Sequence, residues 1–494
     1  MSETQPRASA PGAPGSIARP LVWIALVALV LRLIEAFESS LWLDELHTLS
    51  HASQPTLSAV IEHVGAEFHT PLFFAFVHFF GGFEAGAWLR AIPIVSSVAM
   101  LWPMALVARD CGLTTRSTLC MAWLYACMPY QILYGTELRP YAWIGWLGVL
   151  AFYFAFSERR STFLRLACFF ASILLGLLTH RVMALALLAI GCARLFTKRP
   201  RSVPLWGLIV SGTLAVAGFL PWLIGFAKKA TELRFDYQES VGGYHLRPTL
   251  VKELLALPSR LVTPYMRELG GLWGILALVS AAAFALTALA LIVLAWRGRK
   301  NREASPVLRG VLIFAVAQFV ITTAFAVWTW DRVPLQYYTP MAWTIPLLLA
   351  ACIDRAGHTR ILAIALGATC FLMGIALVGG KSREDMRGAI AAVRKAGAEI
   401  EKSGGKPVYT ALLTQPPQFE HTLPYRAYAR DLEPVAPDRV PRPGEADFAR
   451  PLIVLRRVMP MGNEDWLPIT TGRTIASEVK IDRYLTVYVF TPQP

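Results

Sequence analysis

The sequence predicts an all-α polytopic membrane protein that ends in a small C-terminal α/β domain. Long apolar runs recur through the first 380 residues and stop after that point. Of the 494 residues, 55% are hydrophobic and only 16% are charged, and the mean hydropathy is +0.47. This balance is too apolar for a soluble globular protein, so the composition excludes that class.

The N-terminal segment 1–20 is rich in Pro, Ala, Gly and Ser, a composition typical of disordered chain. The apolar run 21–37 follows it, and no small-x-small cleavage site closes that run. We therefore expect a disordered cytoplasmic tail and a retained first helix, not a signal peptide that is removed.

Largely apolar runs predict about eleven transmembrane helices within 21–380. Several runs are at or below the ~20 residues that a crossing helix needs, so their bounds are approximate. The predicted helices cover 21–37, 89–108, 118–133, 141–156, 165–179, 182–197, 204–224, 271–296, 310–328, 339–353 and 360–379.

The basic residues orient these helices in the cytoplasmic membrane. Lysine and arginine are concentrated in alternate loops, whereas 38–88 contains neither. Because cytoplasmic loops are enriched in both, this pattern places the N-terminus inside and 38–88 outside. With eleven crossings, 381–494 also lies outside. The net charge of +14 then reflects orientation and contact with anionic membrane lipids, and it does not indicate nucleic-acid binding.

Two outer loops need separate interpretation. Segment 71–83 is strongly apolar but has only about 13 residues, too few to cross, and counting it as a crossing would invert every later loop. We predict an interfacial helix there. Loop 225–270 is basic, and it either covers a cavity or contacts lipid headgroups. Its basic residues include Lys228, Lys229, Arg234, Arg247 and Arg267.

The C-terminal segment 381–494 has the size and pattern of a small extracytoplasmic α/β domain. Residues 384–402 predict an amphipathic helix, and 408–413, 453–458 and 484–490 predict strands.

The cysteines predict neither a disulfide framework nor a cysteine metal site. All seven lie in or at the ends of apolar segments, and no CxxC spacing occurs.

Two adjacent carboxylates, Asp44 and Glu45, follow the first apolar run by a few residues. Ionised groups beside a hydrocarbon phase are costly, so such a pair is a functional-site hypothesis. The alternative is that both merely solvate the outer end of a helix. The same loop carries five of the nine histidines, which are His47, His51, His63, His69 and His78.

Two other predicted outer loops also carry polar groups. The seven- or eight-residue loop 134–141 contains Glu137 and Arg139, and a later short loop contains Asp331-Arg332 followed by 336–338. Polar residues at the outer ends of several helices would lie around one cavity at the outer membrane interface.

Four motifs occur in a fixed order: Trp42-Leu43-Asp44-Glu45, then 69–73 (His-Thr-Pro-Leu-Phe), Arg90-Ala91-Ile92-Pro93 and Tyr134-Gly135-Thr136-Glu137-Leu138-Arg139-Pro140-Tyr141. Together they resemble the GT-C superfamily of membrane glycosyltransferases. The resemblance is closest to bacterial relatives of the dolichyl-phosphate-mannose protein mannosyltransferases and to the lipid A aminoarabinose transferase.

Two further segments extend the resemblance over nearly the whole chain. Thr179-His180 is similar to a Thr-His pair at the end of a helix in many relatives, and 383–389 is similar to the start of their C-terminal outer domain, with Met386 where Trp is usual. One departure stands out. The usual Arg-Tyr pair is Gln336-Tyr337 here, so a basic contact is missing unless Arg332 supplies it.

The resemblance implies a GT-C-like catalytic domain that transfers a sugar with inversion from a polyprenyl-phosphate donor to a lipid, glycan or protein acceptor. It makes Asp44 the general base, and Glu45 a catalytic neighbour that orients the site or ligates a metal. The chemistry agrees independently, because nucleotide sugars are cytosolic and an outward-facing transferase needs a lipid-linked donor. Guanidinium groups bind phosphate in a bidentate fork, so Arg139 and Arg332 are candidates for the lipid phosphate. The substrate-binding candidates are His69, Glu137, Arg139, Tyr141, His180, Arg332 and Tyr337.

Several alternatives stay open at this level. Glu137 and Arg139 can pair with each other in a tight loop. His47, His63 and His78 suit interfacial packing better than ligation. His69 can cap a helix or bind a metal. A divalent metal held by Glu45, His69 and His180 is another hypothesis, although their spacing matches no dedicated zinc motif.

Two other function classes compete with a transferase. A transporter or lipid-carrier flippase is the alternative function, but it would favour internal repeats and polar residues near the bilayer midplane. A structural membrane subunit would leave the outer acid pair without a purpose.

Overall fold

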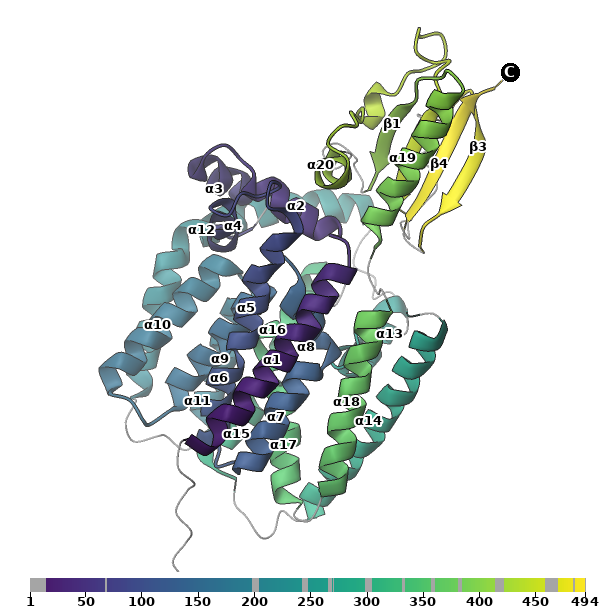
Figure 1. The fold of residues 1–494 in the computed structure, drawn as a ribbon. Helices are drawn as coiled ribbons and strands as arrows, with labels where there is room; N and C mark the ends of the chain where they lie inside the picture. The colour runs from purple at the N-terminus through teal and green to yellow at the C-terminus, as the bar shows by residue number, and fades with distance from the viewer. Residues whose placement is uncertain are drawn as a thin grey trace, which may run out of the picture.

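The chain forms a helical bundle with a small sheet domain at one end (Figure 1). The computed structural model describes residues 15–66, 69–197, 204–241, 248–264, 269, 271–297, 304–330, 334–356, 360–380, 384–413, 422–457, 470–482 and 485–493. It confirms the predicted class, a mostly helical polytopic membrane protein with a C-terminal α/β domain.

The bundle is built from helices, most of which follow the predicted apolar runs. They are α1 (Gly15–Glu38), η1 (Gly86–Arg90), α5 (Ala91–Ala99), α6 (Leu101–Asp110), α7 (Thr115–Cys127), α8 (Pro129–Thr136), α9 (Tyr141–Phe156), α10 (Thr162–Thr179), α11 (Met183–Phe196), α12 (Leu205–Val241), α13 (Pro248–Arg260), α14 (Gly271–Arg297), α15 (Pro306–Trp330), η4 (Leu335–Tyr338), α16 (Thr339–Ala342), α17 (Thr344–Arg355) and α18 (Arg360–Gly379).

Seven of the helices in the described ranges are long and apolar enough to cross a membrane. They cover 17–38, 86–110, 162–179, 205–225, 271–297, 306–327 and 360–379. Two shorter apolar helices, 141–156 and 183–196, match predicted crossings. The count of eleven stays a prediction.

Prolines divide the two remaining predicted crossings. The run 118–133 is split between α7 and α8, because Pro129 has no N–H and pushes Met128 to an extended conformation (φ −66°, ψ 125°). The run 339–353 is split between α16 and α17, where Pro346 cannot donate to the carbonyl four residues earlier.

A buried arginine holds the break between α7 and α8. Arg32, in the second half of α1, donates to the carbonyls of Ala126 (3.1 Å) and Gln131 (3.1 Å), one on each side of the break, and to Ser97 Oγ (2.8 Å). Polar backbone freed inside a membrane needs such partners, so Arg32 fixes α8 against α1.

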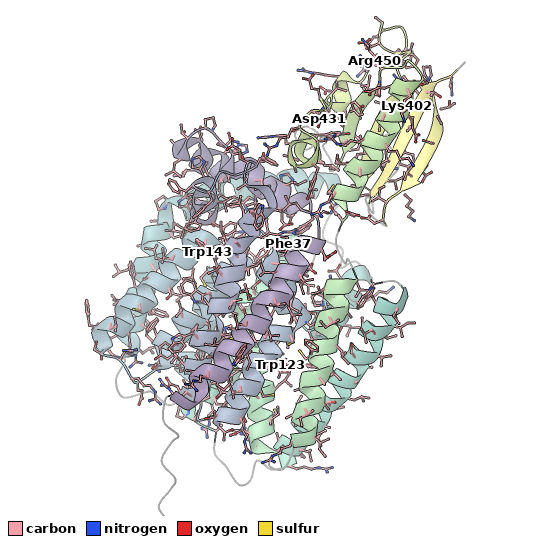
Figure 2. The ribbon with its side chains drawn as sticks, viewed as in Figure 1. Phe37, Trp123, Trp143, Lys402, Asp431 and Arg450 are labelled. Atoms are coloured by element: carbon pink, nitrogen blue, oxygen red, sulfur yellow. The ribbon has the colours of Figure 1, made fainter. Side chains whose placement is uncertain are left out.

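Side-chain contacts tie distant helices together. Trp123 of α7 lies toward α18 (Figure 2) and donates its indole N–H to Gly367 O at 3.1 Å. The buried core extends from α1 through α7, α9, α11, α15 and α17 to α18. This close packing makes the bundle a rigid support for the side chains at its ends.

Three short helices cover one end of the bundle: α2 (Leu43–Ala52), α3 (Leu57–Ala66) and α4 (Pro71–His78). The apolar segment 71–83 does begin with a short helix, as predicted. The helices α2 and α3 were not anticipated from the sequence.

Two segments differ from the sequence prediction. Helix α1 begins at Gly15, so residues 15–20 of the expected disordered tail are helical, whereas 1–14 lie outside the described residues. The expected loop 225–270 is largely helical, because α12 continues to Val241 and α13 follows.

The C-terminal domain packs α19 (Met386–Lys402) against a four-stranded sheet of order β1-β2-β4-β3. Strands β1 (Val408–Leu412), β2 (Leu452–Arg457) and β4 (Leu485–Pro492) match the predicted strands, and α19 matches the predicted helix. Strand β3 (Arg473–Lys480) was missed. The β1–β2 pair is parallel, and the other pairs are antiparallel.

The two ends of the bundle carry different parts of the chain. The start of α1 lies at the end opposite the C-terminal domain, and α2, α3 and α4 share the end that carries this domain (Figure 1). A bilayer crossed by the bundle therefore separates Gly15 from the C-terminal domain. Which side is cytoplasmic stays a prediction from the basic residues.

Candidate active site

The acid pair occupies the first turn of α2, where the helix dipole favours negative charge. Its two members have opposite environments. The side chain of Asp44 is 36% exposed, whereas that of Glu45 is 0% exposed. Asp44 is therefore the member that a substrate can reach.

Glu45 is held in a buried ion pair with Arg90, which lies just before α5. Arg90 Nε donates to Oε1 at 2.8 Å, and Arg90 Nη2 donates to Oε2. The backbone N–H of Leu138 also donates to Oε1 (2.8 Å), and that of Trp42 donates to Oε2 (3.2 Å). Both carboxylate oxygens are thus surrounded by donors. This geometry suits a positioning role for Glu45 and leaves little room for a metal.

Arg139 lies in the short connection between α8 and α9, directly beside Asp44. Its Nη1 donates to Asp44 O (3.2 Å) and to Thr48 Oγ1 (3.2 Å), and its Nη2 is 4.0 Å from Asp44 Oδ2. The predicted loop 134–141 is shorter than expected, because α8 continues to Thr136. Arg139 is consequently a buried cation fixed next to an accessible carboxylate.

A row of aromatic side chains continues from Arg139 across three parts of the bundle. The guanidinium carbon of Arg139 is 5.9 Å from the ring centre of Tyr141. The Tyr141 ring is 6.0 Å from His180, and His180 is 5.7 Å from Tyr337. His180 Nδ1 accepts from the N–H of Val182 (3.2 Å), so a neutral His180 carries its proton on Nε2 and can donate there.

A small, partly open hollow lies beside this row. It is lined by His69, Thr70, Phe74, Pro140, Thr179, His180 and Arg181. Burial lowers the pKa of His69 well below its ordinary value, and the positive charge of Arg139 lowers it further. Burial and Arg181 act in the same direction on the pKa of His180. Both imidazoles are therefore neutral at neutral pH, and the hollow presents uncharged hydrogen-bonding groups beside a cation.

Whether Glu45, His69 and His180 bind a metal stays a prediction. Among the residues that the structure describes, no group of three His, Cys, Asp or Glu side chains is placed to hold a metal ion. Of the three sequence candidates, His69 and His180 both line the hollow, whereas Glu45 is buried against Arg90.

The other candidates are distributed as follows. Glu137 caps the end of α8 and is buried. His78 Nδ1 donates to Ala52 O at 2.8 Å and so ties α4 to α2. His51 packs 5.0 Å from His63 and 5.6 Å from His69, between ring centres. Arg332 lies outside the described residues, so its role stays a prediction.

No protein-family model matches the chain, and no curated protein matches its sequence. Its structure, however, is similar to that of ArnT from Cupriavidus metallidurans bound to undecaprenyl phosphate, with a TM-score of 0.55, 12% identity, and coverage of 97% of this chain and 98% of that chain. The apo state of the same protein gives a TM-score of 0.53 and 14% identity over 95% and 97% of the two chains. The chain has the GT-C fold.

A weaker likeness links the chain to the oligosaccharyltransferase of Archaeoglobus fulgidus, with a TM-score of 0.46, 15% identity, and coverage of 79% and 60%. The similarity to ArnT confirms the GT-C fold that the ordered motifs predicted, and its coverage of 97% of this chain includes the C-terminal domain.

Three residues that hold the elements near the candidate site in place were not identified from the sequence. Arg90 was noticed only as part of a motif, although its charge at the edge of an apolar run was a signal. Arg32 gave a stronger signal, since it is a charge inside the first apolar run. Tyr428 accepts from the N–H of Leu41 (2.6 Å), and no local pattern indicates that contact.

Proposed function

We propose that this protein is an inverting glycosyltransferase. It moves a sugar from a polyprenyl-phosphate donor to an acceptor hydroxyl on the outer face of the cytoplasmic membrane. The observation that carries the proposal is the accessible carboxylate of Asp44, fixed beside Arg139 at the covered end of a GT-C bundle. A base and a phosphate-binding cation are the two groups that this reaction needs.

The reaction is a single displacement. The acceptor oxygen attacks the anomeric carbon while the bond from that carbon to the phosphate oxygen breaks, and the lipid phosphate leaves with the electron pair. Asp44 takes the hydroxyl proton of the acceptor. Inversion at the anomeric carbon follows from the single step.

Arg139 is the group that we assign to the departing phosphate. Its guanidinium is always protonated and can present two parallel N–H groups to phosphate oxygens. The described contacts hold it at Asp44 and Thr48, so it meets the phosphate without first reorganising. Arg332 is a second candidate for this phosphate.

The neutral histidines and Tyr141 suit the sugar. Uncharged hydrogen-bonding side chains beside aromatic rings bind hydroxyl groups without adding charge. We assign His69, His180, Tyr141 and Tyr337 to sugar or phosphate contacts, and Glu137 to the support of Arg139.

The lipid donor is supported by the likeness to ArnT, whose structure contains undecaprenyl phosphate. The test is direct. Purified protein in lipid nanodiscs is incubated with a panel of radiolabelled polyprenyl-phosphate sugars and a membrane extract as the source of acceptor. We expect label to move into the acceptor fraction from at least one lipid donor, and from no nucleotide sugar. Transfer from a nucleotide sugar, or movement of intact lipid without transfer, would reject the proposal.

A further inference from the structure

The turn that joins α1 to α2, residues 39–42, determines where Asp44 lies. Asp44 is only two residues beyond this turn. From the bundle side, Arg90 Nη1 donates to Ser39 O (2.8 Å) and Arg90 Nη2 donates to Ser40 O (2.8 Å). One side of the turn is therefore held by the membrane domain.

The other side of the turn is held by the C-terminal domain. The N–H of Leu41 donates to the hydroxyl oxygen of Tyr428 at 2.6 Å, across 387 positions of sequence. Tyr428 is the last residue of α20 (Leu423–Tyr428), and α20 contacts α2 (Figure 1). Its oxygen is thus the partner that satisfies a main-chain donor in the turn.

A second tie joins the turn to the beginning of α19. Ser40 Oγ donates to Glu384 O (2.7 Å) and accepts from the N–H of Met386 (2.9 Å). The junction is itself anchored, because Arg457 Nε on β2 donates to Glu384 Oε1 at 2.6 Å. Ser40 therefore connects the turn before α2 to the start of α19, and through Glu384 it is connected to strand β2.

Apolar packing and a separate contact reinforce this seam. Buried side chains from both parts form one cluster, which includes Leu41, Leu43, Leu46, Met386, Ile390 and Leu423. Farther along, Arg430 Nη2 donates to Phe83 O at 2.6 Å, and Arg426 lies 4.3 Å from the centre of the Phe83 ring. The domain is docked on the outer helices, so motion of the domain moves the turn.

We propose that the C-terminal domain is a clamp that positions the general base, with Tyr428 and Ser40 as its positioning residues. This inference rests on the proposed role of Asp44. The clamp and Arg90 together fix the start of α2 from opposite sides. A group that takes a proton in the transition state must be placed within a fraction of an ångström, so a loosened turn slows the chemical step without weakening the binding of the lipid donor.

Two variants remove the ties and leave the packing in place. Tyr428→Phe deletes the accepting oxygen and keeps the ring, and Ser40→Ala deletes both hydrogen bonds of the serine. The matched controls are Tyr488→Phe, whose hydroxyl donates to the exposed Glu478 (3.3 Å), and Ser403→Ala at the far end of α19. We expect each clamp variant to lower kcat by about 10- to 100-fold, the scale on which a misplacement of about 1 Å acts.

The controls should keep wild-type kcat, and the KM for the lipid donor should stay within about twofold of wild type in all four variants, because donor contacts are unchanged. A clamp variant with the kcat of its control would overturn the inference. A rise in KM that accounts for the whole loss in kcat/KM would also overturn the inference.

Hydrogen exchange gives a readout that does not depend on catalysis. Amides of residues 40–46 should exchange faster in Tyr428→Phe and Ser40→Ala than in the controls, while the amides of α9 and α18 keep wild-type protection. Unchanged exchange in residues 40–46 would refute the clamp whatever the activity. If the wild type transfers no sugar from any donor, the proposed function fails, and the exchange data still decide whether the domain holds the turn.

Discussion

Breaking the buried ion pair between Glu45 and Arg90 should lower the free energy of unfolding far more than breaking an exposed carboxylate–arginine pair. The change that tests this is Glu45→Gln, which keeps the size of the side chain and removes its charge. In the wild type, four N–H groups point at the two carboxylate oxygens, two at each. Whichever way the amide is turned, its NH₂ group faces two donors, so two hydrogen bonds are lost.

The magnitude follows from burial and charge. The side chains of Arg90 and Glu45 are 1% and 0% exposed, so the variant leaves a buried cation without its counter-charge. Removal of one partner of such a pair costs about 3–5 kcal/mol of folding free energy. Two lost hydrogen bonds to charged groups, at about 1.5–3 kcal/mol each, agree with that range.

The matched control is Asp431→Asn in the C-terminal domain (Figure 2). Asp431 accepts from both Nη atoms of Arg394, but these side chains are 61% and 46% exposed. Solvent screens that pair, so we expect a loss of at most about 1 kcal/mol. The assay is SDS-induced unfolding in mixed micelles, followed by tryptophan fluorescence. Equal unfolding free energies for the two variants would refute the burial argument.

Three further predictions concern the donor, the topology and pH. Arg139→Ala should lower the rate of sugar transfer by about 100-fold or more, because it removes a preorganised hydrogen-bond donor to the developing charge. Arg139→Lys should have an intermediate rate, because lysine keeps the charge but loses the bidentate geometry of the guanidinium group. Equal rates in both variants and in the wild type would contradict this prediction. A reporter that is active only outside the cytoplasm should be active when fused after Phe83 and silent when fused after Arg299, and the reverse pattern would overturn the orientation. His69 and His180 have pKa values lowered well below 6.5, so below pH 6.5 the unfolded chain binds more protons than the folded one. Thermal stability should therefore fall on acidification below pH 6.5, and a His180→Gln variant should lose part of that fall.

Much of the membrane domain could be predicted because the bilayer dictates the length and polarity of crossing helices. The predicted segment 141–156 coincides with α9, and 360–379 coincides with α18. The breaks were not predicted. A helix interrupted at Pro129 is still apolar, and its freed backbone groups are satisfied by Arg32, a partner nearly 100 residues away that hydropathy does not reveal.

The proximity of several candidate residues could be predicted, because helix ends on one side of a membrane lie close together. Asp44, Arg139, His180 and Tyr337 do lie in one continuous row. The burial of Glu45 could not be predicted, since it depends on the tertiary contact of Glu45 with Arg90. Adjacent acids look equivalent in sequence, whereas one faces solvent and the other is enclosed.

The C-terminal domain illustrates another limit. Strands β1, β2 and β4 are largely buried, and their apolar runs were recognisable. Strand β3 lies at the sheet edge with nearly all of its residues exposed, so it lacks the alternation of apolar and polar residues that marks a half-buried strand.

The assignment of Asp44 as the general base is the central claim. Its most direct test measures the rate of sugar transfer by Asp44→Asn and by wild type with the same lipid donor, together with the affinity of each protein for that donor. The account predicts a fall of about 100-fold or more in the transfer rate, the usual contribution of a positioned acid–base group, with donor binding retained. Near-wild-type transfer by Asp44→Asn would contradict it.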